Sequence, residues 1–249
     1  MVLLHGITAS GDVFGAGWDP LGADGHVVIP DILGFGRSMD ESASDFSLDA
    51  HLRALEEMLV ELALDERSLT LVGHSLGGLL ALHWAARSPR VERVVALCAP
   101  LYASAVEADE RIAGMGWLER AFALEGRAAE TLCAWMCRHR TMAAWLMVAL
   151  EPTWPVIIAR YGVRHTWASY LGAMNGVIRR GGWEKPLRQL EVRHVPVVLA
   201  DGALDRVPVP GRAAEIAATH GNVRRVIHPT ADHELPITHP VWSLDVVRR

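Results

Sequence analysis

The sequence has few cysteines, no long apolar run and no cluster of basic residues. Its 249 residues include only three cysteines, Cys98, Cys133 and Cys137, an odd number that does not suit a framework of disulfides and fits a reducing compartment. No uninterrupted apolar run reaches the roughly 18 residues of a membrane-spanning helix. The net charge is −5 and the basic residues are scattered, so we do not expect nucleic acid as a partner.

Two further absences bear on location and cofactors. No charged segment followed by an apolar one is visible at the start of the sequence, so no signal peptide is expected, and we predict a cytoplasmic protein without stable membrane insertion. Cys133 and Cys137 lie four residues apart on a predicted helix, but no cluster of histidines or cysteines completes a metal site with them. We therefore expect two packed thiols and no metal.

The most informative segment runs from Leu69 to Leu79 and places a serine between two glycines. An apolar strand precedes the sequence Gly73-His-Ser-Leu-Gly77, and an apolar helix follows it. This G-x-S-x-G pattern puts the serine in a sharp turn between strand and helix, with its hydroxyl projecting from the sheet. We interpret Ser75 as the candidate nucleophile of a nucleophile elbow. An ordinary glycine-rich turn is the less specific alternative.

A serine hydroxyl becomes a good nucleophile when a neutral imidazole accepts its proton and a carboxylate orients that imidazole. Asp205 follows a strand predicted at 195–200, and His233 follows a strand predicted at 223–227. The carboxyl ends of parallel strands share one edge of a sheet, where ligands bind. We therefore predict that Ser75, Asp205 and His233 converge at that edge as a catalytic triad.

The same reasoning suggests the groups that surround the triad. Asp201 also ends a strand, but it is closer to the sheet and is interpreted as a turn residue. A developing oxyanion needs two preorganised donors, and the N–H of Leu76, directly after the nucleophile, is one candidate for this oxyanion hole. The N–H of Ile7 is the other, because Gly6 lets the backbone of that loop approach. His74 is expected to pack or hydrogen-bond beside the pocket.

The remaining sequence divides into two kinds of region. Residues 1–100 and 189–249 alternate apolar strands with helices, which predicts an α/β fold with a doubly wound, mostly parallel sheet. Residues 101–188 show no convincing strand and hold six of the nine tryptophans, which predicts an inserted helical cap domain, or lid. Core packing and the lining of a substrate pocket both remain open as explanations of this content. In the second case, Trp145 and Trp154 line the pocket.

At this point the sequence resembles the α/β-hydrolase superfamily, in its lidded branch of serine esterases and lipases. The segments that carry the resemblance are Leu4-His-Gly-Ile7, Asp31-Ile-Leu-Gly-Phe-Gly-Arg-Ser38, Gly73-His-Ser-Leu-Gly-Gly78, Asp201-Gly-Ala-Leu-Asp205 and Ala231-Asp-His233. The resemblance implies that Ser75 is the nucleophile, Asp205 the acid and His233 the base. It also implies that Ile7 and Leu76 are the oxyanion donors, with no cofactor and no metal. Epoxide hydrolases and dehalogenases resemble this branch, but they use aspartate at the elbow.

The expected function is hydrolysis of a carboxylic ester of a small apolar substrate through an acyl-enzyme on Ser75. Carbon–carbon bond hydrolases, perhydrolases and acyltransferases use the same triad, and a ligand receptor that retains it is a further alternative.

Members of the family usually carry two strands before the one at 2–5, and here the sequence begins inside that strand. Compared with the family pattern, either the start of the sequence is misassigned or the sheet lacks its first two strands. The short strand predicted at 27–29 would then become an exposed apolar edge, which favours pairing with a second copy as a homodimer.

Overall fold

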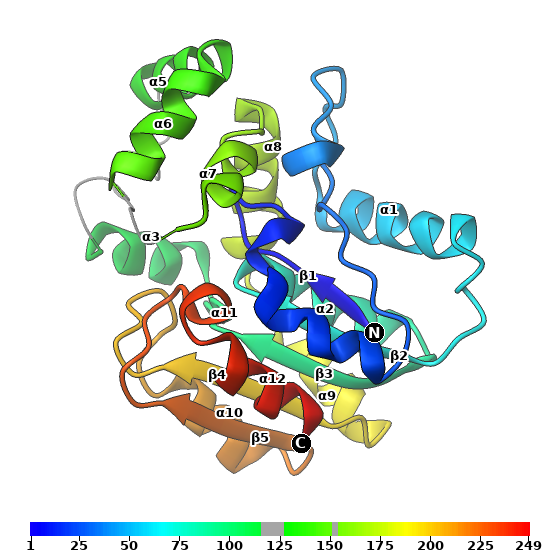
Figure 1. Cartoon of the computed structure of the whole chain (residues 1–249). Coiled ribbons are helices and arrows are strands. Elements are labelled where there is room, and N and C mark those ends of the chain that lie inside the picture. Colours follow the sequence, from blue (N-terminus) through cyan, green and yellow to red (C-terminus); the bar gives the residue numbers. More distant parts are fainter. Residues whose placement is uncertain (116–126, 151–153) are drawn as a thin grey trace.

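The computed structural model describes residues 1–115, 127–150 and 154–249. Figure 1 shows a sheet with helices on both faces. In the described residues the sheet has five parallel strands, in the order β1 (Val2–Leu4), β2 (Leu69–His74), β3 (Val91–Leu97), β4 (Val197–Gly202) and β5 (Val223–His228). The predicted α/β fold class is confirmed.

Successive side chains of each strand enter two different apolar layers, one on each face of the sheet. On β3, Val94 and Ala96 belong to one layer, whereas Val95 and Leu97 belong to the other. The first layer includes α1 (Leu48–Glu61), α2 (Leu76–Arg87), α9 (Glu184–Val192) and α10 (Arg212–Thr219). The second includes the 3₁₀ helices η1 (Gly11–Val13) and η2 (Ala16–Ala23), with α11 (Leu235–Thr238) and α12 (Pro240–Arg248). Both faces are covered, which explains why the inner strands are largely apolar, whereas the edge strand β5 carries the exposed Arg224 and Arg225.

The strand predicted at 27–29 is reduced to a single bridge. Val28 pairs in parallel with Val2, and its carbonyl accepts a hydrogen bond of 2.9 Å from the Leu3 N–H. Pro30 has no N–H to continue the pairing, and β1 itself is only three residues long. The expectation of an apolar strand along this edge is therefore wrong, although Ile29 is still 37% exposed.

Between β3 and β4 the described residues form helices. These are α3 (Ala105–Ala113), α5 (Arg127–Arg138), α6 (Arg140–Leu150), α7 (Val156–Gly162), α8 (Trp167–Ala173), the π-helical turn η4 (Met174–Ile178) and α9. A bridge between His165 and Phe35, next to the 3₁₀ helix η3 (Gly36–Ser38), ties this region to the core.

Two parts of the predicted cap, residues 116–126 and 151–153, lie outside the described residues, and the cap boundaries at 101 and 188 remain a prediction. Among the helices that are described, none has the length and apolar character needed to cross a membrane. Figure 1 shows α5 and α6 projecting away from the sheet, at the top of the view.

Candidate active site

Ser75 lies at the junction of β2 and α2 in a backbone conformation that non-glycine residues rarely adopt, with φ 53° and ψ −118°. The glycines beside it are required by close backbone contacts. A Cβ atom on Gly73 would lie 2.1 Å from the Gly77 carbonyl oxygen, and one on Gly77 would lie 2.2 Å from the Leu4 carbonyl oxygen. The Ser75 N–H donates to the Leu97 carbonyl oxygen on β3 at 2.9 Å, which anchors the turn to the sheet. Such strain is typical of functional sites.

Asp205 and His233 form a hydrogen-bonded pair at the carboxyl ends of β4 and β5. His233 Nδ1 lies 2.9 Å from Asp205 Oδ2, and the Val207 N–H donates to Asp205 Oδ1 at 2.8 Å. Burial favours the neutral carboxyl, but the hydrogen bond and charge of His233 outweigh it and lower the pKa of Asp205. An ionised Asp205 can only accept, so His233 Nδ1 carries a proton and Nε2 is left as the basic atom.

His233 itself has a raised pKa. Burial acts in the opposite direction, but the hydrogen bond and the negative charge of Asp205 outweigh it, with smaller contributions from Glu234 and Asp232. Among the described residues there is no hydrogen bond between Ser75 Oγ and His233, although both line one cavity. Contacts of this kind often become short only when the substrate is bound.

The loops that carry the acid and the base are bonded directly to one another. The Ala203 N–H donates to the His228 carbonyl oxygen at 2.8 Å, and the Leu204 N–H donates to the Ala231 carbonyl oxygen at 2.9 Å. A Cβ atom on Gly202 would lie 2.2 Å from that same Ala231 oxygen, so the close approach of the loops depends on this glycine. Motif reasoning predicted Asp205 and His233 as partners of Ser75 but missed these bonds, which carry no sequence signal beyond Gly202.

His74 has a positioning role that the sequence indicated only in outline. Its Nε2 atom lies 2.8 Å from the carbonyl oxygen of His233 and must be the donor, because a carbonyl only accepts. Burial, followed by the nearby charge of His233, lowers the pKa of His74 to about 3. His74 therefore stays neutral and fixes the backbone of the candidate base.

One group in the described part of the chain has the spacing of metal ligands: His74, Cys98 and His233, whose ligand atoms lie within 4.8 Å of one another. Metal binding would require a Cys98 thiolate. Without a bound ion, burial and the nearby Asp205 carboxylate raise the pKa of Cys98.

Ser75 and His233, two of the candidate triad residues, open onto a cavity of about 290 Å³. His74 and Trp154 line it as well, together with Ile7, Tyr102, Ile112, Met115, Tyr170, Met174 and Ile178. Trp145 does not line it: this ring is 63% exposed on α6. Of the three residues expected in the pocket, His74 and Trp154 line the same cavity as Ser75, and Trp145 lies on the surface.

The loop after β1 passes close to the nucleophile. A Cβ atom on Gly6 would lie 3.3 Å from Ser75 Cβ, and the following residue, Ile7, lines the cavity. His5 fixes this loop, because its Nδ1 atom lies 2.7 Å from the Gly6 carbonyl oxygen and its Nε2 atom accepts the Ile32 N–H at 2.8 Å. Leu76 begins α2, where backbone N–H groups lack partners within the helix. The assignment of these two N–H groups to an oxyanion hole remains a proposal.

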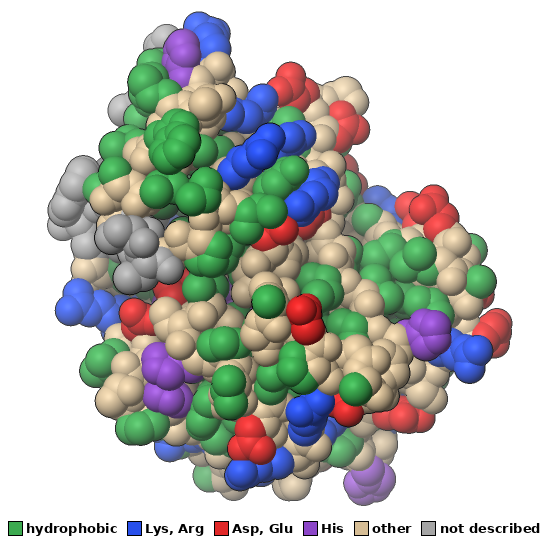
Figure 2. Space-filling model, viewed as in Figure 1, with side chains coloured by type: hydrophobic (Ala, Val, Ile, Leu, Met, Phe, Trp, Pro, Cys, Tyr) green, Lys and Arg blue, Asp and Glu red, His purple; other side chains and the backbone are tan. Residues whose placement is uncertain are grey.

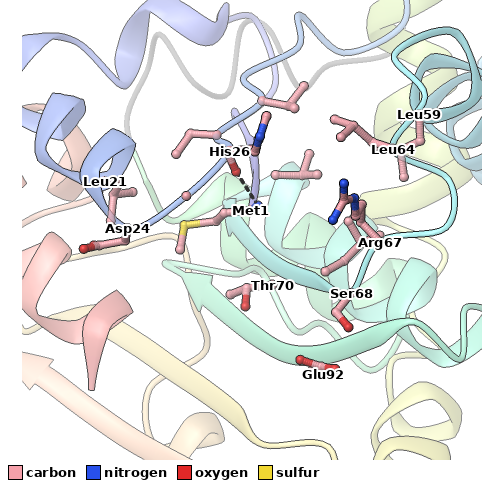
Figure 3. A pocket seen from close by; sticks show the side chains of 15 residues that line it. Met1, Leu21, Asp24, His26, Leu59, Leu64, Arg67, Ser68, Thr70 and Glu92 are labelled. Atoms are coloured by element: carbon pink, nitrogen blue, oxygen red, sulfur yellow. Dashed lines mark hydrogen bonds between the residues drawn. The ribbon is translucent and has the colours of Figure 1, made fainter.

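A second cavity, of about 270 Å³, lies at the opposite ends of the strands and is shown in Figure 3. Leu69 and Thr70, at the start of β2, line it with Arg67 and Glu92, and the N-terminal ammonium of Met1 donates to the His26 carbonyl oxygen beside it at 2.7 Å. Ligands of parallel α/β sheets bind at the carboxyl ends of the strands. This cavity is therefore not where the candidate catalytic groups meet.

Residues 1–131 match the family model described as alpha/beta hydrolase fold, and this is more than half of the chain. The chain belongs to the alpha/beta hydrolase fold family.

Two relatives and one solved structure show the range of the similarity. Uncharacterized protein Rv2715 of Mycobacterium tuberculosis is 31% identical over 125 residues, which are 50% of this chain and 36% of that protein. Probable lysophospholipase BODYGUARD 4 of Arabidopsis thaliana is 28% identical over 238 residues, which are 86% of this chain and 54% of that protein. The chain thus spans between a third and slightly more than half of these relatives.

The crystal structure of the N-formylmaleamic acid deformylase of Pseudomonas putida has a TM-score of 0.74 to this chain at 21% identity, covering 99% of this chain and 90% of that one. At this identity the likeness concerns the fold.

Proposed function

We propose that this protein is a serine hydrolase that cleaves a carboxylic ester of a small apolar substrate. The observation that carries the proposal is the Asp205–His233 hydrogen bond at the rim of an apolar cavity that Ser75 also lines. The ionised Asp205 holds His233 in the tautomer whose Nε2 atom can accept a proton. Three groups with complementary roles in acyl transfer therefore meet at one place.

In the proposed reaction, Ser75 Oγ attacks the acyl carbonyl carbon while His233 Nε2 takes the hydroxyl proton. The tetrahedral oxyanion accepts hydrogen bonds from the N–H groups of Ile7 and Leu76. The C–O bond of the ester breaks, and the alcohol leaves with the proton held by His233. Water then attacks the acyl-enzyme, His233 takes its proton, and the carboxylic acid departs as Ser75 is restored.

The cavity lining favours an uncharged substrate. Its described lining residues include no lysine and no arginine, whereas Glu234 adds a carboxylate near the base. A substrate carboxylate would be desolvated there without a cationic partner, which is costly. This supports a simple ester over a substrate that carries a carboxylate. The similarity to a probable lysophospholipase is in keeping with an ester.

The test is labelling with a fluorophosphonate, followed by turnover of p-nitrophenyl esters and of a β-diketone. We expect wild type to be labelled once and to turn over esters many times, and Ser75→Ala to lose both properties. Ser68→Ala is the control, because this exposed serine lines the second cavity. Labelling that survives in Ser75→Ala would overturn the assignment.

Each alternative gives its own outcome in the same experiment. Faster cleavage of the β-diketone would favour a carbon–carbon bond hydrolase, and a stoichiometric burst without turnover would favour a receptor. Ester formation with an added alcohol that is faster than hydrolysis would favour an acyltransferase. Peracid formation with hydrogen peroxide that is faster than hydrolysis would favour a perhydrolase.

A further inference from the structure

Helix α6 carries an apolar stripe that faces solvent. Met142, Trp145, Leu146, Ala149 and Leu150 follow one another at three- and four-residue steps, which is the spacing of one helix face, and all five are exposed. The exposed fractions are 51% for Met142, 63% for Trp145 and 53% for both leucines. This spacing normally marks the side of a helix that packs against a core.

The neighbouring helices extend this apolar surface. On α5, Leu132 is 40% exposed and Trp135 is 42% exposed, and at the start of α7 Val156 is 54% exposed. We call the surface made by these three residues and the α6 stripe the α5–α7 face. Figure 2 shows hydrophobic side chains gathered over α5 and α6, with basic and histidine side chains at their tip. Contiguous apolar surface of this kind marks an interaction site.

Basic side chains share the helix faces that carry this surface. Arg138 follows Trp135 by three residues on α5, and Arg160 follows Val156 by four residues on α7; both are exposed and, in the described part of the chain, neither forms an ion pair. Arg140 is paired with Glu41 at 3.0 Å. Residues 127–150 and 154–165 together contain five arginines and one glutamate, with no lysine or aspartate, in a chain whose net charge is −5.

We propose that the α5–α7 face docks on the surface of an anionic lipid bilayer. Tryptophan and arginine beside an apolar helix face are the side chains that suit the boundary between headgroups and acyl chains. Charge complementarity selects this occupant over a second copy of the chain. A two-fold contact through the same face would bring the arginines of both copies together, whereas anionic headgroups would neutralise them. The helices lie on the membrane and do not span it.

Helix α7 connects this face to the candidate active site. Val156 is exposed on the face, while Trp154 and Ile158, two residues to either side, line the cavity of Ser75. Docking would therefore bring lipid close to the cavity. The docking itself does not depend on the proposed hydrolysis and can be measured without it.

The experiment is flotation of the full chain, carrying Ser75→Ala so that no lipid is cleaved, with vesicles of phosphatidylcholine alone or mixed with phosphatidylglycerol. We expect binding to the mixed vesicles that weakens as salt is raised. Arg138→Glu and Arg160→Glu should each weaken binding to the mixed vesicles by about fivefold or more. Trp145→Ala should weaken it by roughly tenfold or more through lost apolar burial.

The matched control is Val241→Ala, at a residue that is 77% exposed on α12, far from this face in sequence and fold; it should bind as the parent does. Circular dichroism checks that each variant is folded. Failure to bind the mixed vesicles, or equal binding by Trp145→Ala, would overturn the proposal. A dimer in solution that Trp145→Ala or Arg138→Glu disrupts, without vesicle binding, would assign the face to a second copy instead.

Discussion

Helices α2 and α6 are similarly apolar, yet α2 is mostly buried and α6 is mostly exposed to solvent. Helix α2, with the sequence LGGLLALHWAAR, buries nine of its twelve residues. Helix α6, with the sequence RTMAAWLMVAL and fully within the described residues, buries only Ala143. Both sequences predict a helix that is buried away from solvent. The first is buried against the sheet, whereas the second contacts α5 and α7 on one side and leaves its apolar stripe exposed to solvent.

The difference shows that the apolar content of a helix predicts that the helix will be buried. It does not predict which surface the helix packs against. Helix α2 follows β2 directly through the Ser75 turn. Because this connection is so short, α2 must pack against the sheet. Helix α6 lies in the region predicted to be a cap, and in the described residues it packs against its sequence neighbours α5 and α7 and not against the sheet. The core should therefore respond strongly to small substitutions, and α6 should hardly respond at all.

The largest expected effect concerns Asp205, the proposed acid of the triad. Asp205→Asn should lower kcat by about 10⁴-fold, because the amide would favour the wrong tautomer of His233. Asp201→Asn is the matched control and should cost less than about tenfold, since Asp201 makes no hydrogen bond to His233 in the described structure, although burial and the charge of Asp205 raise its pKa to about 6. Steady-state kinetics on one ester compares the two. A greater loss in Asp201→Asn would reassign the acid.

The next effect concerns the free energy of unfolding and compares one leucine substitution on each of the two helices. Leu80→Ala removes a fully buried side chain of α2 and should lower the free energy of unfolding by about 2–5 kcal/mol. Leu146→Ala changes a half-exposed side chain on α6 and should stay within about 0.5 kcal/mol of wild type. Urea denaturation measures both. Similar losses would mean that α6 is packed against something in solution.

Sequence reasoning worked best where chemistry demands a particular residue at a particular turn. Only glycine fits at Gly73 and Gly77, so the motif around Ser75 could be found from the sequence, and the order of strands then brought Asp205 and His233 to the same edge. Trp145 was predicted to line the pocket and lies instead on the exposed surface of α6, for the opposite reason. A tryptophan suits a core, a pocket or a surface equally well, and only tertiary packing decides between them.

Two local features could not be predicted from the sequence, for related reasons. The apolar run at 27–29 resembles a strand, but pairing depends on what lies beside it, and only Val28 finds a partner. The bond from His74 to the backbone of His233 joins residues 159 positions apart. No local pattern could reveal it, because any histidine can donate to any carbonyl within reach.

The pH dependence of the reaction should follow His233. Only the neutral imidazole can accept the Ser75 proton, and the raised pKa of His233 keeps it protonated to a higher pH than a free imidazole. We expect kcat/KM to fall about tenfold per pH unit below a midpoint above about 6.5. Glu234→Gln removes one of the charges that raise this pKa and should move the midpoint to lower pH, whereas Asp245→Asn, on α12, should leave it in place. A midpoint that rises in Glu234→Gln would contradict this account.

The smallest expected effect separates two tryptophans that the sequence treated alike. Trp154 lines the cavity of Ser75, whereas Trp145 is exposed on α6. Each acyl methylene that enters the cavity should add roughly fourfold to kcat/KM until the space is filled, after which activity falls. For p-nitrophenyl esters we expect a peak between butyrate and octanoate in the wild type. Trp154→Ala enlarges the cavity and should move the peak to longer chains, while Trp145→Ala should not move it for esters in free solution. A peak that shifts in Trp145→Ala and stays in place in Trp154→Ala would show that α6 closes over the cavity during turnover. A flat profile of kcat/KM against chain length would show that the apolar cavity is not the source of specificity.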